Sequence, residues 1–203
     1  MKIIKEACVE TCDEIDFAAK NKADRIELCS HLEIGGLTPT LEMIDYAISK
    51  KLNIAAMIRV NDNFCANSDE LLQMQKQICD IRDMNICAFV FGLLTPENKI
   101  DFLAMEKLIS CCGAKEVVFH MAFDKLNDKV EALEELAKIG VKRILTKGGE
   151  GKAVDNIEML KRLQRASVGK IEIMAGGGIT SKNWHDIFCK TQITQFHGRK
   201  IFE

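Results

Sequence analysis

The sequence predicts a single α/β domain over residues 1–203, in which parallel strands close into a (β/α)8-type barrel. Short runs of apolar and β-branched residues alternate with longer amphipathic segments along the whole chain. This alternation is typical of parallel strands joined by right-handed helical crossovers. There are eight such runs, and no G-x-G-x-x-G motif follows the first of them, which argues against an open dinucleotide-binding sheet. The prediction is therefore a TIM-like barrel.

The eight predicted strands follow one another at the spacing of strand-plus-helix units. They cover residues 3–9, 23–29, 54–60, 88–93, 116–123, 141–146, 170–176 and 194–198. The last run is the weakest. No amphipathic segment follows it, so we expect a barrel that lacks a full C-terminal helix.

The predicted helices begin and end at typical capping residues. Thr38 and Pro39 open the helix after the second strand, with proline at the first helical position. Ser68 is expected to cap the next helix, in which apolar residues recur at three- and four-residue spacing. Gly140 lies where a left-handed residue would end the helix before strand 141–146.

Composition and charge exclude several functional classes. The chain is 47% hydrophobic and 29% charged, which is ordinary for a globular domain. Its net charge of −2 and the absence of a basic cluster argue against a nucleic-acid partner. We see neither a long apolar run nor a leader pattern, so we expect no membrane span and a cytoplasmic protein. The nine cysteines, of which Cys111 and Cys112 are vicinal, are then expected to be reduced thiols.

Ionisable side chains gather in one phase of most predicted strands. In a barrel this phase faces the interior, and its last layer opens at the C-terminal end, where such barrels carry their sites. The candidate catalytic residues are Glu6, Glu27, Arg59, His120, Asp124, Glu172 and His197. We expect them to converge on one cavity, because burying them is costly unless they pair or bind a ligand. The alternative is a purely structural ion-pair network.

An enzymatic interpretation gives these residues separate roles. His120, expected beside Asp124, is the natural acid/base group because its ordinary pKa lies near neutrality. Arg59 would anchor an anionic substrate, with Glu27 or Glu172 as the partner of the histidine.

Two glycine clusters follow the sixth and seventh strands and are candidate ligand-binding segments. They are Gly148 and Gly149, and Gly176, Gly177 and Gly178. In barrels of this type, backbone amides near the last strands often hold a phosphate, and glycine lets them approach it closely. The alternative is that tight turns require glycine with or without an anion.

The first two strands both end in a Glu-x-Cys triplet, Glu6-Ala7-Cys8 and Glu27-Leu28-Cys29. Adjacent strands lie ~4.8 Å apart, a spacing that two metal–thiolate bonds of ~2.3 Å each can span. Two thiolates suit a soft ion, so Cys8 and Cys29 are candidate ligands of Cu(I). The alternative is a pair of reduced cysteines packed inside the barrel.

Several blocks follow one another in order along the chain. They are residues 23–29 (ADRIELC), 35–40 (GGLTPT), 57–59 (MIR), 119–124 (FHMAFD), 143–146 with 148–149 (RILT, GG) and 173–178 (IMAGGG). Together these blocks resemble the CutC copper-homeostasis family. The resemblance covers nearly the whole chain. It implies a TIM-like barrel, often dimeric, with a cytoplasmic role in copper tolerance.

The chain also departs from that family pattern. Val60 and Asn61 stand where the family usually has Pro-Arg, and Met121 stands where an arginine usually follows the histidine. Lys147 replaces a serine before the glycine pair. Two cations are therefore missing near the mouth of the barrel, which would weaken an anion-binding role common to the family.

Three functional hypotheses follow. The first is a CutC-like copper-homeostasis protein that binds Cu(I) at the C-terminal end of the barrel. The second is a barrel enzyme of the lyase or isomerase type acting on a small anionic or phosphorylated metabolite. The third is a scaffold or dimerisation module. The expected partners are a metal ion or small anionic ligand and a second copy of the chain.

Overall fold

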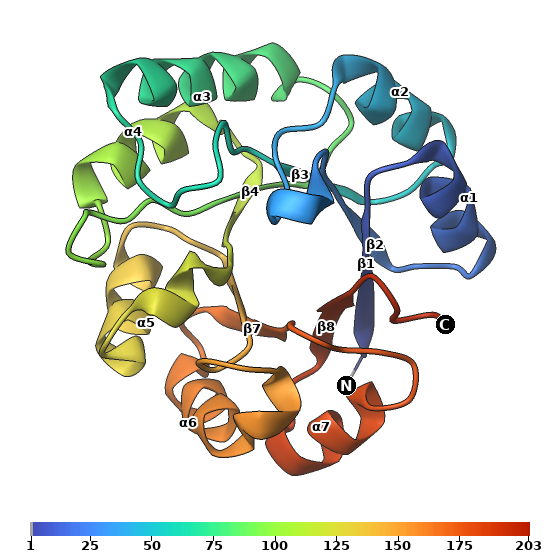
Figure 1. The fold of residues 1–203 in the computed structure, drawn as a ribbon, viewed down its shortest axis with the longest axis vertical. Coiled ribbons are helices and arrows are strands. Elements are labelled where there is room, and N and C mark those ends of the chain that lie inside the picture. The colour runs from blue at the N-terminus through green and yellow to red at the C-terminus, as the bar shows by residue number, and fades with distance from the viewer. Residues whose placement is uncertain (1) are drawn as a thin grey trace.

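Eight parallel strands close into a barrel in the computed structural model, which describes residues 2–203. Each strand pairs with the next along the chain, and β1 also pairs with β8. The strands are β1 Ile4–Val9, β2 Arg25–Leu28, β3 Ile54–Met57, β4 Ala88–Phe91, β5 Glu116–Phe119, β6 Arg143–Thr146, β7 Glu172–Ala175 and β8 Gln195–Gly198. The predicted fold class is confirmed (Figure 1).

Seven helices surround the barrel (Figure 1). They are α1 Cys12–Lys20, α2 Leu41–Ser49, α3 Ser68–Ile81, α4 Phe102–Cys111, α5 Lys129–Lys138, α6 Ile157–Ser167 and α7 Trp184–Thr191. Three short 3-10 helices, η1 Leu32–Ile34, η2 Met121–Lys125 and η3 Ala153–Asp155, lie in the loops after β2, β5 and β6. Gly140 follows α5 in a left-handed conformation, as predicted. Within residues 2–203, none of the helices is both long and apolar enough to cross a membrane.

Two predicted helix starts are shifted by a residue or two. Thr40, rather than Thr38, caps α2, so Pro39 lies before the helix. Asn67 caps α3, and Ser68 is the first helical residue. The Asn67 side chain accepts a hydrogen bond from the backbone of Glu70, whose carboxylate bonds back to Asn67 N–H. This reciprocal pair satisfies two backbone N–H groups, which explains why Asn67 takes the capping position.

Alternation along the strands separates an outer from an inner layer of side chains. The outer layer packs between strands and helices and includes Ile26, Leu28, Phe89, Phe91, Ile144 and Phe196. The inner layer includes Cys8, Cys29, Ala55, Met57, Val90, Val118, Leu145 and Met174. The apolar phase predicted for β2 therefore faces the helices.

No helix follows β8 in the described residues, as the sequence predicts. The segment after β8 ends in the gap between α1 and α7 (Figure 1). A groove of about 500 Å³ lies there, and its lining includes Phe17 of α1 and Phe202 near the chain end.

Candidate functional site

An open cavity lies at the C-terminal ends of the strands. Its volume is about 700 Å³. Its walls come mainly from the loops after β2, β3, β5 and β6, and side chains of β1, β2 and β8 lie at its base. The predicted site residues that line it are Cys8, Glu27, Arg59, His120, Asp124, Gly149 and His197.

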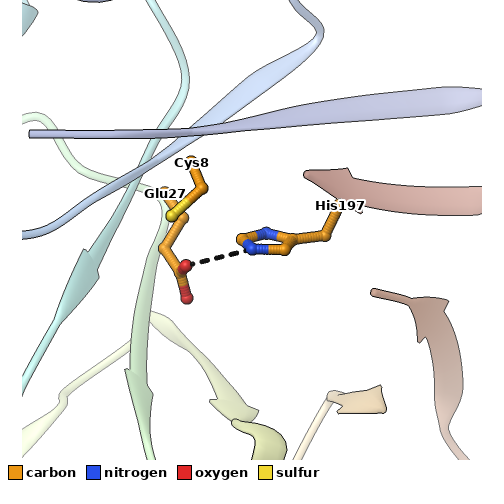
Figure 2. A group of neighbouring side chains, drawn as sticks. All are labelled: Cys8, Glu27 and His197. Atoms are coloured by element: carbon orange, nitrogen blue, oxygen red, sulfur yellow. Dashed lines mark ion pairs between the residues drawn. The ribbon is translucent and has the colours of Figure 1, made fainter. Parts of the chain in front are cut away.

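Three of these residues form a cluster at the base of the cavity (Figure 2). One potential ligand atom from each of Cys8, Glu27 and His197 lies within 4.8 Å of the other two. His197 Nε2 is 3.5 Å from Glu27 Oε2, and all three residues are buried. A thiol, a carboxyl and an imidazole are the donor groups that transition metals use in proteins, so this cluster is a candidate metal site.

The register of the strands brings the cluster together. Cys8 of β1 lies beside Glu27 of β2, whereas Glu6 lies beside Arg25. On the other side of β1, Glu6 lies beside His197. Because neighbouring strands of a closed barrel are staggered, the two Glu-x-Cys triplets are offset by two residues. Glu27, not Cys29, is the register partner of Cys8.

The Cys29 thiol nevertheless lies close enough to Cys8 for the two groups to shift each other's pKa in opposite directions. Cys29 is 1% exposed and lies just beyond the end of β2. Gly36, at φ +93°, covers it so closely that a Cβ there would lie 3.2 Å from Cys29 Sγ. Cys8 therefore faces the cavity, and Cys29 lies behind it.

A buried ion-pair network supports the cluster from below. Glu6 pairs with the Arg25 guanidinium through Nε, and its other oxygen lies 2.8 Å from His197 Nδ1. Burial opposes ionisation of Glu6, but the charge of Arg25 and the hydrogen bond with His197 outweigh it and lower its pKa to about 2. Burial also opposes protonation of His197, but Glu27 when it is ionised, together with Cys8 and Glu6, raises its pKa well above the ordinary value. His197 is therefore an imidazolium held by Glu6.

Of the three acidic side chains here, Cys8 is a thiolate, whereas Cys29 and Glu27 keep their protons near neutral pH. The neighbouring Cys29 thiol is the largest cause that lowers the pKa of Cys8, to about 5. Cys8, together with burial, raises the pKa of Cys29 well above its ordinary value. Burial raises the pKa of Glu27 to about 8, so its 3.5 Å contact with His197 joins an imidazolium to a neutral carboxyl. Glu27 Oε1 is buried without a hydrogen-bond partner.

Arg59 lies on the wall of the cavity with its charge unpaired by any carboxylate. Its guanidinium donates, at distances of 2.6 to 3.4 Å, to the backbone carbonyl oxygens of Ile34, Gly36, Asp62 and Asn63. It also stacks over the ring of Phe64, 5.1 Å from the centroid. Four of its five N–H donors are thus occupied, and one remains for a ligand.

The expected pairing of His120 with Asp124 is wrong. His120 Nδ1 accepts a hydrogen bond of 3.3 Å from the Ala122 backbone, while Asp124 binds Thr146 Oγ1 at 2.6 Å and the Lys147 backbone N–H at 3.1 Å. Burial, and then the charge of Arg59, lower the pKa of His120 to about 3. His120 is therefore neutral at physiological pH. The pairing fails because η2 starts at Met121 and turns Asp124 toward β6.

Glu172 does not share the cavity, which corrects the expectation that all inward carboxylates converge. It is the first residue of β7, at the N-terminal end of the barrel, and bonds Gln195 at 2.6 Å and Arg143 at 3.2 Å. Glu6 also lies below the cavity and is absent from its lining. The alternation of side chains along each strand placed Glu6 and Glu172 inside the barrel. It does not specify how high along the barrel axis each side chain lies.

Close packing accounts for most of the predicted ligand-binding glycines, and only Gly149 lines the cavity. The Gly148 N–H donates to Thr146 Oγ1 at 2.8 Å. A Cβ at Gly176 would lie 2.6 Å from Leu145, and one at Gly177, which has φ +79°, would lie 2.7 Å from Lys147. Gly178 has φ +82° and precedes α7 by several residues. The expectation that Gly176, Gly177 and Gly178 face a ligand in this cavity is therefore not met.

Sequence reasoning did not assign Arg25 or Gln195, although both shape the site. Arg25 Nη2 donates to Gln195 Oε1 at 3.0 Å, and Gln195 in turn bonds Glu172, so the network crosses the barrel interior. Arg25 lies two residues before Glu27 on β2 and therefore faces the same way, into the barrel. That spacing was the signal in the sequence that could have identified Arg25. Gln195 lies in the weakest predicted strand, where no clear phase was available.

The similarity to known proteins extends over the whole barrel. The CutC family profile matches residues 3–202. A family protein CutC of Streptococcus pyogenes serotype M6 is 36% identical over 208 residues, which cover 98% of this chain and 100% of that protein. A human relative named copper homeostasis protein cutC homolog is 35% identical over 198 residues, covering 96% of this chain and 72% of the human protein.

A crystal structure of CutC from Streptococcus agalactiae is similar over the whole barrel. The TM-score is 0.92 at 35% sequence identity, and the match covers 98% of this chain and 99% of that one.

Proposed function

The chain belongs to the CutC family, named for copper homeostasis, and on that basis we propose that it binds Cu(I) between the thiols of Cys8 and Cys29. The observation that carries the proposal is a pair of neighbouring buried thiols, of which Cys8 lines the base of an open cavity. Cu(I) prefers soft thiolate ligands, and Cys8 supplies one already ionised near neutral pH. Copper is here the cargo of the protein.

The donor groups fit a monovalent soft ion. The lowered pKa of Cys8 makes it a thiolate and the raised pKa of Cys29 keeps it a thiol, so Cu(I) would displace the Cys29 proton, which leaves to solvent through the cavity. His197 adds a positive charge beside the sulfurs, which helps to balance a bis-thiolate complex. The burial of both sulfurs also protects them from competing water.

The proposal includes a cytoplasmic location. All nine cysteines are free thiols, and several are exposed, including Cys12, Cys79 and Cys189. Exposed thiols persist where the redox poise is reducing, as it is in the cytosol. A reducing compartment is also the one in which copper stays monovalent.

An anaerobic Cu(I) titration tests the proposal. We expect Cys8→Ser and Cys29→Ser each to lose one equivalent of tightly bound Cu(I) relative to the unchanged protein, because each removes one of two sulfur ligands. The measurement is competition with a chromophoric Cu(I) chelator. Cys112→Ser is the matched control, since Cys112 is also buried but donates to the Leu108 carbonyl at 3.2 Å on α4. Unchanged stoichiometry in both cavity variants would eliminate the proposal.

A second candidate function rests on a different observation, the unpartnered Glu27 Oε1 at the base of a cavity large enough for a metabolite. Glu27 keeps its proton near neutrality, which suits an acid/base group in a lyase or isomerase. Arg59 has one free N–H, and Lys147 also lines the cavity, so the walls offer cations to a small anionic substrate. In this function Glu27 takes the proton-transfer role first expected of His120, because burial and Arg59 lower the pKa of His120 to about 3 and so make it a weak base.

A thermal-shift screen with phosphorylated sugars and small carboxylates tests the second function. We expect an anion that fits the cavity to raise the melting temperature of the protein, and Lys147→Met to reduce that rise. Lys138→Met, on the outer helix α5, is the matched control and should leave the rise unchanged. If no compound stabilises the protein, or if Lys147→Met responds like the control, the cavity is not an anion site.

A further inference from the structure

Three cysteines gather on the outer helical layer, away from the barrel interior. Cys79 lies near the end of α3, Cys111 is the last residue of α4, and Cys112 follows it. Helices α3 and α4 lie side by side (Figure 1). The sequence showed the vicinal cysteines at 111 and 112 but gave no sign that Cys79 would join them.

Contacts across the two helices place the Cys79 and Cys111 thiols together. Gln75 lies one turn before Cys79 on the same face of α3, and its Nε2 is 3.8 Å from Cys111 Sγ. Besides burial, the neighbouring Cys111 thiol raises the pKa of Cys79, which is consistent with the two thiols lying close together. Cys112 is different, because it is buried and its thiol donates to the Leu108 carbonyl. The interacting pair is therefore Cys79 with Cys111.

This pair is open to solvent. Cys79 is exposed and Cys111 is half-buried, whereas Cys8 and Cys29 are buried inside the barrel. Neither Cys79 nor Cys111 lines the central cavity. The Cys111 thiol also donates to the Lys107 carbonyl at 3.3 Å, which fixes its side chain along α4. A ligand can thus reach both sulfurs without entering the barrel.

We propose that Cys79 and Cys111 form a second, surface site for a soft monovalent cation such as Cu(I), held between the two sulfurs. The cation binds as thiolate ligands form and thiol protons leave to solvent, so no oxidant or reductant is needed. The site is independent of the Cys8–Cys29 pair.

The test uses a Cys8→Ser/Cys29→Ser background, in which the interior sulfur pair is removed. Cu(I) in acetonitrile is titrated anaerobically against a chromophoric chelator, and we expect this variant to retain one equivalent. Adding Cys79→Ser or Cys111→Ser should abolish it. Adding Cys65→Ser, at a half-buried cysteine in the loop before α3, is the matched control and should leave it in place. The surface site would be overturned if the Cys8→Ser/Cys29→Ser variant bound no Cu(I). It would also be overturned if that variant kept its equivalent of Cu(I) after Cys79→Ser or Cys111→Ser was added.

Two further measurements keep the outcomes separate. If the interior variants misfold, the same comparison is made in the otherwise unchanged protein, where Cys79→Ser with Cys111→Ser should lower the stoichiometry by one. If the interior pair binds no copper, the unchanged protein and the Cys8→Ser/Cys29→Ser variant will have equal stoichiometry, and the surface equivalent will still depend on Cys79. A disulfide between Cys79 and Cys111 after treatment with oxidised glutathione, found by peptide mass mapping without any Cu(I) uptake, would instead identify a redox pair.

Discussion

Replacing Arg25 by methionine is expected to destabilise the protein by about 3–5 kcal/mol, because it removes the larger counter-charge of the buried Glu6 carboxylate and leaves only His197 beside it. The side chains of Glu6 and Arg25 are only 1% and 10% exposed. Removing one partner of a buried pair costs more than the pair itself contributes, since the remaining charge keeps its desolvation penalty. Arg25 also donates to Gln195 Oε1 at 3.0 Å, and that acceptor would lose its donor. Urea denaturation measures the change in the free energy of unfolding.

Arg199→Met is the matched control for this loss. Arg199 also pairs with carboxylates, at 2.9 Å to Glu14 and 3.3 Å to Glu10, but its side chain is 50% exposed. Exposed ion pairs contribute at most about 1 kcal/mol. Adding Glu6→Gln to Arg25→Met should recover part of the loss, because an amide has no charge to bury. Equal losses in the Arg25 and Arg199 variants would mean that the interior network does not stabilise the barrel.

The second large effect is a shift in the pH at which Cys8 becomes reactive. Its thiolate, with a pKa of about 5 against an ordinary 9.0, should react with iodoacetamide in a profile whose midpoint lies near pH 5. Cys29→Ala removes the largest cause of the lowered pKa, so the midpoint should rise by several pH units toward 9. The extent of alkylation is measured by mass spectrometry of the peptide that carries Cys8.

Cys65→Ala is the control for that shift and should leave the Cys8 midpoint in place, because Cys65 lies in the loop before α3. His197→Gln should also raise the midpoint, by less than Cys29→Ala, since His197 is a smaller cause of the lowered pKa. A midpoint near 9 in the unchanged protein would show that the buried sulfur pair holds no thiolate. The Cu(I) proposal would then lose its ionised ligand.

Most of the fold was predictable because it depends on local patterns. Alternation of strand and helix predicts parallel strands, and the apolar phase of β2 assigns Ile26 and Leu28 to the helical layer, where the structure has them. Capping positions were predicted less well. Thr40 and Asn67 took the places expected of Thr38 and Ser68, because several neighbouring residues can cap a helix and the side-chain bonds made in place decide among them.

The candidate site was predictable only in part. Inward phase correctly selected residues of the interior, and Cys8, Glu27, Arg59 and His197 line one cavity. Phase did not show that Glu172 lies at the opposite end, nor that His120 and Asp124 turn to different partners. These outcomes depend on the position of each side chain along the barrel axis and on the geometry of the loops. The alternation of side chains along a strand gives no information about either.

The sequence by itself determined the class of fold, the side chains that face the barrel interior, and the family to which the chain belongs. The tertiary structure alone decided which of them meet. The stagger of β1 against β2 places Cys8 beside Glu27 and leaves Cys29 one layer higher, and barrel closure brings His197 from the far end of the chain onto Glu6. Protonation follows from that assembly, because charges separated widely along the chain shift one another's pKa only when folding buries them in contact.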